Sequence, residues 1–168
     1  MMRTKVINDS TDLVSLIRAF DDQTKKDVFG EISKDWTPVS TIKNKYGKKG
    51  EAALELFDKM KLAETKWTTP EEGIDGKPQK MYRSFYSLFN INISCPVHEI
   101  SDIFNVSSLD PKDFKRLEDE VYNYIGDDGK YGNSVSEYFG ITNTALKALA
   151  KRSNRVEYTG LRLTRTSL

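Results

Sequence analysis

The apolar residues of this chain change their spacing near residue 62, and this change constrains the fold more than any other feature of the sequence. Before it, they recur three and four positions apart, as in residues 13–20, which is the period of an amphipathic helix. Residues 62–68 and 80–93 are instead rich in aromatic and β-branched side chains, which favours strands. The pattern therefore predicts several helices followed by a two-stranded hairpin.

Capping residues mark the helix boundaries that precede the hairpin. Thr37 and Pro38 predict a helix start, because threonine caps a first turn and proline fits the first helical position. Gly47 predicts the end of that helix, and a further helix is expected at 49–61. The stretch 70–78 is dense in turn formers. Short helices followed by a hairpin with a long polar tip are typical of a winged helix-turn-helix.

Helical spacing returns after the hairpin. The apolar residues of 97–104 predict one amphipathic helix. Asp110 and Pro111 then predict the cap and first residue of a longer helix that ends near Gly126. These helices are expected to link the first unit to the last part of the chain.

The last part of the chain repeats the same order on a smaller scale. Two short helices are expected at 133–139 and 142–153, and a tight hairpin at 156–164. We therefore predict an α+β, mainly helical fold, with an N-terminal winged-helix domain at 1–95 and a C-terminal helical or winged-helix-like domain at 96–168.

The segment from Val135 to Leu149 resembles a helix-turn-helix. Ser136 is small enough for the place where two helices cross, and Gly140 can take the positive φ of the turn. Thr142 is a good cap for the second helix. Any packed helical hairpin with a glycine turn would show the same pattern, so both interpretations stay open.

The same register can be laid on the first unit, with Gly47 in place of Gly140, 93 residues later. Lys43 and Lys48 depart from the pattern, because they stand where a small and an apolar residue are expected. The match suggests a degenerate duplication. The apolar matches in this register are Ile42 with Val135, Tyr46 with Phe139, Ala53 with Leu146, and Leu56 with Leu149.

Charge is distributed unevenly along the chain. The sequence carries 26 basic and 25 acidic side chains, but residues 141–168 hold six basic and one acidic, and residues 96–140 hold four basic and ten acidic. A basic cluster suggests a polyanion as partner. The alternative is a solvated surface without a partner, and charge alone does not separate the two.

In each of the two helix-turn-helix candidates, the second helix has an outward face, and the two faces favour different roles. Glu51, Glu55 and Asp58 face outward in the first unit, where carboxylates repel phosphate. Basic residues face outward in the second unit, which is therefore the better candidate for reading DNA. The candidate DNA-binding residues of the C-terminal unit are Thr142, Asn143, Thr144, Lys147, Lys151 and Arg155. Those of the first unit are Lys43, Lys45, Lys48, Lys49, Lys77 and Lys80.

Cys95 and His98 are the only cysteine and the only histidine. A Cys-x-x-His pair supplies half of a tetrahedral zinc site, but a lone cysteine at a strand end is more often a small buried apolar residue. The sequence contains no two-histidine metal motif and no glycine-rich phosphate loop. We therefore expect no catalytic residues, no metal site and no cofactor, and an enzyme ranks as a distant third function.

The order of elements resembles that of the archaeal ArsR-type winged helix-turn-helix transcriptional regulators. The residues that carry the resemblance are Leu13–Phe20, Thr37–Gly47 and Leu54–Met60. The resemblance implies DNA binding as a dimer and, in the founding branch of the family, release of DNA on metal binding. That branch has a cysteine pair on the recognition helix. This chain has no cysteine between Lys48 and Lys61, so metal sensing is not expected.

The sequence thus predicts a cytoplasmic transcriptional regulator that binds double-stranded DNA as a homodimer and has no membrane partner. The alternative is a winged-helix protein-interaction module that does not bind DNA directly. The acidic first recognition helix favours this alternative. The operator, the effector, the sign of regulation, the unit that reads DNA and any role of Cys95 and His98 stay open. The candidate residues of the subunit seam are Leu13, Leu16, Ile17, Phe114, Leu117, Val121 and Tyr124.

Overall fold

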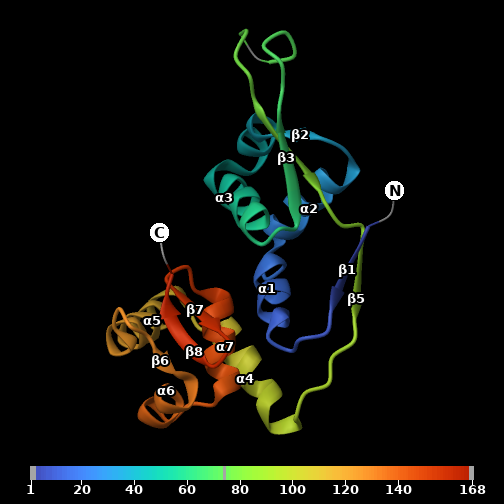
Figure 1. Cartoon of the computed structure of the whole chain (residues 1–168). Coiled ribbons are helices and arrows are strands. Elements are labelled where there is room, and N and C mark those ends of the chain that lie inside the picture. The colour runs from blue at the N-terminus through green and yellow to red at the C-terminus, as the bar shows by residue number, and fades with distance from the viewer. Residues whose placement is uncertain (1–2, 74, 167–168) are drawn as a thin grey trace. The chain divides into compact units, whose positions relative to one another are not determined.

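The computed structural model describes residues 3–73 and 75–166, and Figure 1 labels its elements. The chain forms two compact units. The first contains the residues up to Val6 and Arg18–Ile91, and the second contains Ile7–Ile17 and the residues from Asn92 onward. The described residues form seven helices and three small sheets, which confirms a mainly helical α+β fold. The predicted boundary at residue 95 lies close to Ile91, and the independence of the two domains stays a prediction.

Two helices packed on a three-stranded sheet make most of the first unit. The elements are α2 (Gln23–Lys34), β2 (Thr37–Pro38), α3 (Val39–Lys59), β3 (Ala63–Trp67) and β4 (Lys80–Ser84). The sheet is antiparallel in the order β2-β4-β3, with Thr37 opposite Tyr82 and Ala63 opposite Ser84. The helices and the sheet bury one apolar core. Its buried side chains are Ala19, Val28, Ile32, Ile42, Ala53, Leu54, Phe57, Leu62, Ala63 and Tyr82.

A glycine divides α3 into two helical segments. Gly47 has φ 64° and ψ −152°, a backbone conformation that favours glycine, because other residues have a Cβ that clashes there. The predicted helix end at Gly47 is therefore confirmed. The segments 39–46 and 48–59 on either side of it present their apolar faces to the same core.

The second unit contains the remaining helices and another three-stranded sheet. Its elements are α4 (Val97–Ser108), α5 (Pro111–Ile125), β6 (Lys130–Tyr131), α6 (Gly132–Phe139), α7 (Asn143–Arg152), β7 (Val156–Thr159) and β8 (Arg162–Arg165). The sheet is antiparallel in the order β6-β8-β7, and α4 packs along α7 (Figure 1). The buried core includes Val14, Ile103, Val106, Phe114, Val121, Ile125, Val135, Leu146, Leu149, Val156 and Leu163.

The helix boundaries of the second unit follow the predicted caps. Asp110 accepts hydrogen bonds from the backbone N–H groups of Lys112 and Asp113 at the start of α5. Gly140 is left-handed, with φ 63° and ψ 32°, and Thr142 accepts from the N–H of Ala145 at 3.0 Å. These contacts confirm the two caps and the predicted turn between α6 and α7.

The two units repeat one order of elements: a helix, a two-residue strand, two helical segments around a glycine, and a hairpin. The strand orders β2-β4-β3 and β6-β8-β7 are equivalent. The first residues of β2 and β6 lie 93 positions apart, as do Gly47 and Gly140 and the first residues of β3 and β7. This agreement supports the predicted duplication.

The register of the duplication shifts after the glycine. In the second helical segment the buried positions pair Leu54 with Leu146 and Phe57 with Leu149, an offset of 92. The predicted pairing of Leu56 with Leu149 is therefore one residue out. Leu56 is only half-buried, because the apolar face of this segment has turned by one position relative to that of α7.

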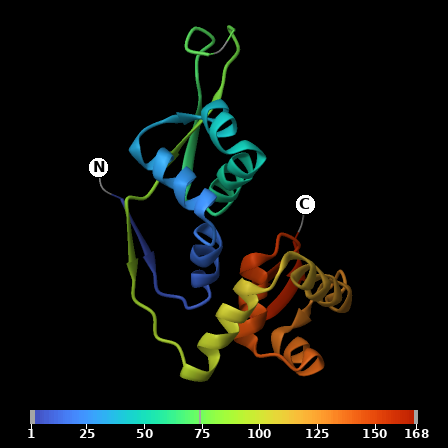
Figure 2. The same ribbon diagram turned by 180° about the vertical axis from the view of Figure 1, so that it is seen from behind.

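The predicted strand at 80–93 is wrong in its middle. It divides into β4 and β5 (Leu88–Ile91), and β5 pairs with β1 (Thr4–Ile7) in a separate two-stranded ribbon (Figure 2). The break follows from local hydrogen bonding, because the Ser84 hydroxyl donates to the carbonyl of Tyr86 at 2.5 Å. At the same point the Phe85 N–H turns to the carbonyl of Leu62.

The predicted cap at Thr37 is also wrong. Thr37 and Pro38 form the strand β2, and the Thr37 hydroxyl donates to the carbonyl of Asp35 instead of capping a helix. Helix α3 begins at Val39 without a side-chain cap. Pairing of β2 with Tyr82 and Met81 of β4 holds this segment extended.

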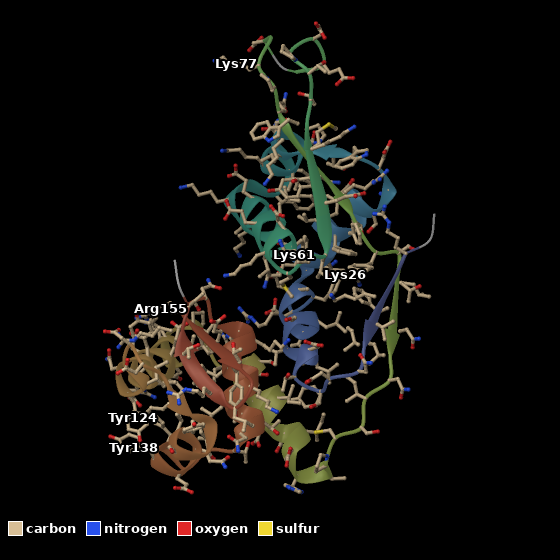
Figure 3. All side chains as sticks on the ribbon, viewed as in Figure 1. Lys26, Lys61, Lys77, Tyr124, Tyr138 and Arg155 are labelled. Carbon is tan, nitrogen blue, oxygen red and sulfur yellow. The ribbon has the colours of Figure 1, made fainter. Side chains whose placement is uncertain are left out.

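The apolar stripe of α5 packs inside its own unit. Phe114 and Val121 are buried in the core, and Leu117 packs against it. Tyr124 stacks on Tyr138 of α6 with ring centroids 4.0 Å apart (Figure 3). These four residues of the predicted seam are therefore engaged within one chain.

Helix α1 (Asp12–Ala19) supplies the other residues of the predicted seam. Leu13 packs against the core of the second unit, next to the fully buried Val14. Leu16 and Ile17 are half-buried and belong to neither core cluster. Of the seven residues, only these two therefore pack against neither core.

Candidate nucleic-acid interface

The glycine turn of α3 gathers four of the predicted lysines within residues 43–49. Lys48 and Lys49 directly follow Gly47, at the start of the second helical segment, and both are exposed. Within the described residues neither side chain forms an ion pair or a hydrogen bond. Their two ammonium groups are open to an anionic partner.

The other two lysines of the turn are paired at the surface. Lys43 lies 3.0 Å from Glu51, and Lys45 lies 2.5 Å from Glu31. The hydrogen bond to Glu31 raises the pKa of Lys45, and the same contact lowers the pKa of Glu31. Exposed ion pairs of this kind are weak, so a polyanion can compete for these lysines.

The second segment of α3 carries the predicted acidic face. Glu55 is exposed, whereas Glu51 and Asp58 are partly screened by Lys43 and Lys80. Lys80 Nζ lies 3.0 Å from Asp58, so this predicted DNA-binding residue neutralises a carboxylate of the same unit. The groove along this face is lined by Glu51, Glu55, Asp58, Lys59, Lys61 and Lys80, among others.

The β3–β4 hairpin holds a lysine beyond the end of the sheet. The Thr68 N–H donates to the carbonyl of Gln79, and the Gln79 N–H donates to the Thr68 hydroxyl, so the strands stay together past β3 and β4. The Ser40 hydroxyl donates to Gln79 Oε1 at 2.6 Å, which ties the hairpin to the start of α3. Lys77 is exposed at the far end of this hairpin (Figure 3).

The first turn of α7 is occupied by carboxylates of α4. The Thr142 hydroxyl donates to Asp102 Oδ2 at 2.6 Å, and the Thr144 hydroxyl donates to Glu99 Oε2 at 2.6 Å. Both predicted DNA-binding hydroxyls therefore already have acceptors within their own unit. The first turn of α7 thus presents two carboxylates beside the hydroxyls that were expected to face DNA.

Asn143 lies between these threonines and is also engaged. Its Nδ2 donates to Asn133 Oδ1 at 2.7 Å. Its Oδ1 is buried and accepts no hydrogen bond from the described residues. The amide therefore links α7 to α6.

Lys147 and Lys151 lie further along α7. Lys147 is exposed, with its Nζ 5.6 Å from the centre of the Tyr158 ring. Lys151 Nζ lies 2.6 Å from Asp12 Oδ1. Both lysines line one hollow of about 400 Å³ in the second unit. The structure thus brings these two predicted residues together, beside acidic side chains.

Arg155 is bound to α5. Its guanidinium pairs with Asp119, lies 3.6 Å from Glu118 and stacks over the Tyr122 ring at 4.1 Å. The hydrogen bond to Asp119 raises the pKa of Arg155. The side chain therefore links the start of β7 to α5 instead of extending the outer face of α7.

Sequence reasoning missed the acidic partners of the basic C-terminal end. Asp12, Glu99, Asp102 and Asp119 each contact one of the residues predicted to bind DNA. One sequence feature could have predicted these partners: the acidic excess of residues 96–140 lies next to the basic excess of residues 141–168. Opposite charges in neighbouring segments can neutralise one another within the chain as readily as attract a partner.

Cys95 and His98 lie in different surroundings. Cys95 is half-buried against the apolar core of the second unit, and the His98 side chain is 80% exposed, with Nε2 3.7 Å from Glu99. One thiol and one imidazole are too few for a soft metal ion. In residues 3–73 and 75–166, no group of three or more His, Cys, Asp or Glu could hold a metal ion. No helix in these ranges is long and apolar enough to cross a membrane.

An α+β fold with exposed lysines at a helix turn fits the class of transcriptional regulators. The family model described as ArsR transcriptional regulator matches residues 7–167. The chain therefore belongs to the ArsR family of transcriptional regulators, and the expectation that it is not an enzyme agrees with this family. No curated protein and no solved structure gives a match.

Proposed function

We propose that this protein regulates transcription by binding double-stranded DNA through the glycine turn of α3 and the β3–β4 hairpin. The observation that carries the proposal is the exposure of Lys48 and Lys49, which have no ion pair within the described residues. At the start of α7, by contrast, the predicted residues Thr142 and Thr144 are held by carboxylates of α4. The first unit therefore leads DNA binding, which reverses our sequence-based preference for the C-terminal unit.

The order of elements supports a winged helix-turn-helix in the first unit. Residues 39–46 and 48–59 are its two helices around Gly47, and the β3–β4 hairpin is its wing. A recognition helix enters the major groove with its N-terminal residues, where Lys48 and Lys49 lie. Lys77 at the wing tip then reaches a neighbouring phosphate.

The carboxylates of the recognition helix are compatible with this role. Glu51 and Asp58 are screened by Lys43 and Lys80, which reduces their repulsion of phosphates. Glu55 is exposed without an ion pair in the described part of the chain, and a carboxylate in the major groove can accept a hydrogen bond from cytosine N4.

The protein acts as a homodimer in this proposal, because a two-fold symmetric DNA site needs two readers at a fixed spacing. The α5 stripe is buried in its own unit, so the seam uses other apolar residues. Candidates are Leu16 and Ile17 of α1, with Val6, Leu88 and Ile91 of the β1–β5 ribbon, which are at least half exposed.

The test is the salt dependence of binding to genomic DNA fragments. If Lys48 and Lys49 each contact a phosphate, replacing both with Gln should lower the log–log slope by about 1.8, since each contact contributes about 0.9. Lys26→Gln with Lys34→Gln on α2 removes the same charge from the same unit and should change the slope less. Circular dichroism of each variant checks that it is folded.

A matched pair on α7 decides which unit leads. Lys147→Gln with Lys151→Gln should reduce affinity less than the change at Lys48 and Lys49. The opposite ranking would make the C-terminal unit the reader. It would support the sequence-based prediction that the C-terminal unit reads DNA, which was drawn from the basic charge of residues 141–168.

The second candidate function is a protein-interaction module, which the acidic face of Glu51, Glu55 and Asp58 favours. A carboxylate face suits a basic protein partner better than phosphate. Wild-type protein that binds no genomic DNA fragment at low salt, but remains folded, would favour this alternative over DNA binding.

A further inference from the structure

An acidic segment of the same unit lies beside the outer face of α7. Lys147 and Lys151 are four residues apart on α7, so they lie on one face of the helix. Lys151 Nζ is 2.6 Å from Asp12 Oδ1, and Asp9 and Thr11 line the same hollow as the two lysines. Residues 9–12 thus present carboxylates to the face that the sequence predicts to be a phosphate site.

The Asp9 carboxylate is held in its charged form. The backbone N–H and the hydroxyl of Thr11 both donate to Asp9 Oδ1, at 2.8 and 2.6 Å. The Thr11 hydroxyl is the main cause that lowers the pKa of Asp9, and the ammonium groups of Lys151 and Lys147 lower it further. Asp9 therefore carries its negative charge beside α7 at neutral pH.

The acidic segment has a fixed position. Ile7 and Thr11 are buried on either side of Asp9, and Val14 is fully buried in the core of the second unit. The backbone that carries Asp9 and Asp12 is thus anchored at both ends. The contact is a built part of the unit and not a loose tail lying on it.

We propose that residues 9–12 mask a second phosphate-binding surface on α7, in which Asp9 and Asp12 stand where DNA phosphates would lie beside Lys147 and Lys151. The inference rests on the proposed function, because the phosphates belong to DNA that the first unit holds, and the carboxylates keep them from the two lysines. Unmasked, the two lysines add phosphate contacts. Masked, they contribute little to binding.

Exposure lets phosphates reach the two lysines once the carboxylates have lost their charge. The side chains of Lys151 and Asp12 are 46% and 36% exposed, and partly exposed ion pairs of this kind are weak. A polyphosphate backbone would then bind these lysines with the release of condensed counterions.

The surface suits phosphates and not bases. The first turn of α7 is held against α4 through Thr142 and Thr144, so it is not free to enter a groove. Lys147 and Lys151 lie in the middle and last turns of the helix, where a side chain can reach a phosphate along the duplex. Unmasking this surface therefore changes the affinity for DNA of every base sequence alike.

The test uses the full chain with Asp9→Asn and Asp12→Asn together, changes that keep the side-chain shape and remove the charge. Binding to a genomic DNA fragment should become tighter at low salt. The log–log salt slope should steepen by about 1.8, for two added phosphate contacts at about 0.9 each. Adding Lys147→Gln and Lys151→Gln should remove this gain, whereas the same lysine changes alone should alter the slope little.

Asp21→Asn with Asp27→Asn is the matched control. It removes two carboxylates from the first unit, where Asp21 pairs with Arg18 and Lys25. An equal gain in this control, or an unchanged slope in the Asp9 and Asp12 variant, overturns the masking surface. A gain that persists after the two lysines are removed overturns it as well.

A direct readout separates this inference from DNA binding itself. Hydrogen exchange of the amides of residues 12–17 should become faster when Lys147 and Lys151 are both changed to Gln, because the segment loses its partners. Unchanged exchange overturns the masking contact. Wild-type protein that binds no DNA while this exchange effect is present defeats the proposed function and leaves the intramolecular contact supported.

Discussion

Gly50 lies so close to Tyr46 that a Cβ atom added to the glycine would stand 2.7 Å from the Cβ of Tyr46. The same atom would stand 2.9 Å from Cγ2 of Ile42, which is fully buried. The two helical segments of α3 therefore cross at a residue without a side chain. Such a crossing needs a small residue. In the structure this residue is on the second helical segment, whereas the sequence pattern expected it on the first, at Lys43.

Gly50→Ala should destabilise the protein by about 1–3 kcal/mol, the usual cost of overpacking a core. The added methyl group must push Tyr46 or Ile42 aside or change the crossing of the two helices. The free energy of unfolding, measured in urea at neutral pH, tests this. DNA binding of the folded fraction should also weaken, since Lys48 and Lys49 lie between Gly47 and the crossing.

Gly30→Ala is the control for this change. Gly30 is an exposed residue within α2, and a Cβ there would meet nothing within 4 Å. Alanine in a helix interior is favoured over glycine by about 0.5–1 kcal/mol, so this variant should be more stable than wild type. Equal effects of the two alanines would contradict the close crossing at Gly50.

Local chemistry made most of the elements predictable. Asp110, Thr142 and Gly140 act on neighbouring backbone groups, so each could be assigned from a few adjacent residues. The two-residue strands β2 and β6 escaped prediction because pairing with distant strands, not propensity, holds them extended. The pairing of β1 with β5 escaped it for the same reason.

The candidate site was harder to predict than the fold. Helical spacing put Lys147 and Lys151 on an outward face, and both are exposed. It could not say which element covers such a face, because periodicity carries no information about distant partners. Asp12 and Glu99 approach α7 from other helices, and only the folded unit brings them there.

Glu64 should contribute to stability in a pH-dependent way. Arg83 donates to its Oε1 at 2.7 and 3.0 Å, and this contact, with Arg3, lowers the pKa of Glu64. A lowered pKa in the folded state means stability that is present above the unfolded value, about 4.3, and lost as pH falls through the folded value. Glu64→Gln should therefore be less stable than wild type at pH 7, and the difference should shrink on acidification.

Urea unfolding at a series of pH values from neutral to strongly acidic measures this difference. Glu71→Gln is the control, because Glu71 is exposed in the hairpin and forms no ion pair with the described residues. Its stability should follow that of wild type at every pH. A gap between Glu64→Gln and wild type that stays constant with pH would argue against the Arg83 contact as its source.

Metal ions should not release this protein from DNA. Zinc, cadmium and arsenite need several thiolate or imidazole ligands, and the chain offers one of each, with Cys95 packed on a core and His98 turned to solvent. DNA affinity should change by no more than a few-fold when any of these ions is added, and Cys95→Ser should bind DNA as wild type does. Purified protein that holds stoichiometric zinc, and loses both zinc and regulation on Cys95→Ser, would refute this.

The subunit seam of the proposed dimer should involve the β1–β5 ribbon. Val6, Leu88 and Ile91 are 57%, 54% and 50% exposed there, and burial of such apolar surface between two subunits favours association. Sedimentation at micromolar concentration should give twice the monomer mass for wild type, and Leu88→Asp should shift the protein to monomer, because a carboxylate in an apolar seam loses its hydration. Leu161→Asp, at a residue 76% exposed between β7 and β8, should stay dimeric. A monomeric wild type would contradict the dimer, and a dimeric Leu88→Asp would move the seam away from the ribbon to Leu16 and Ile17 of α1.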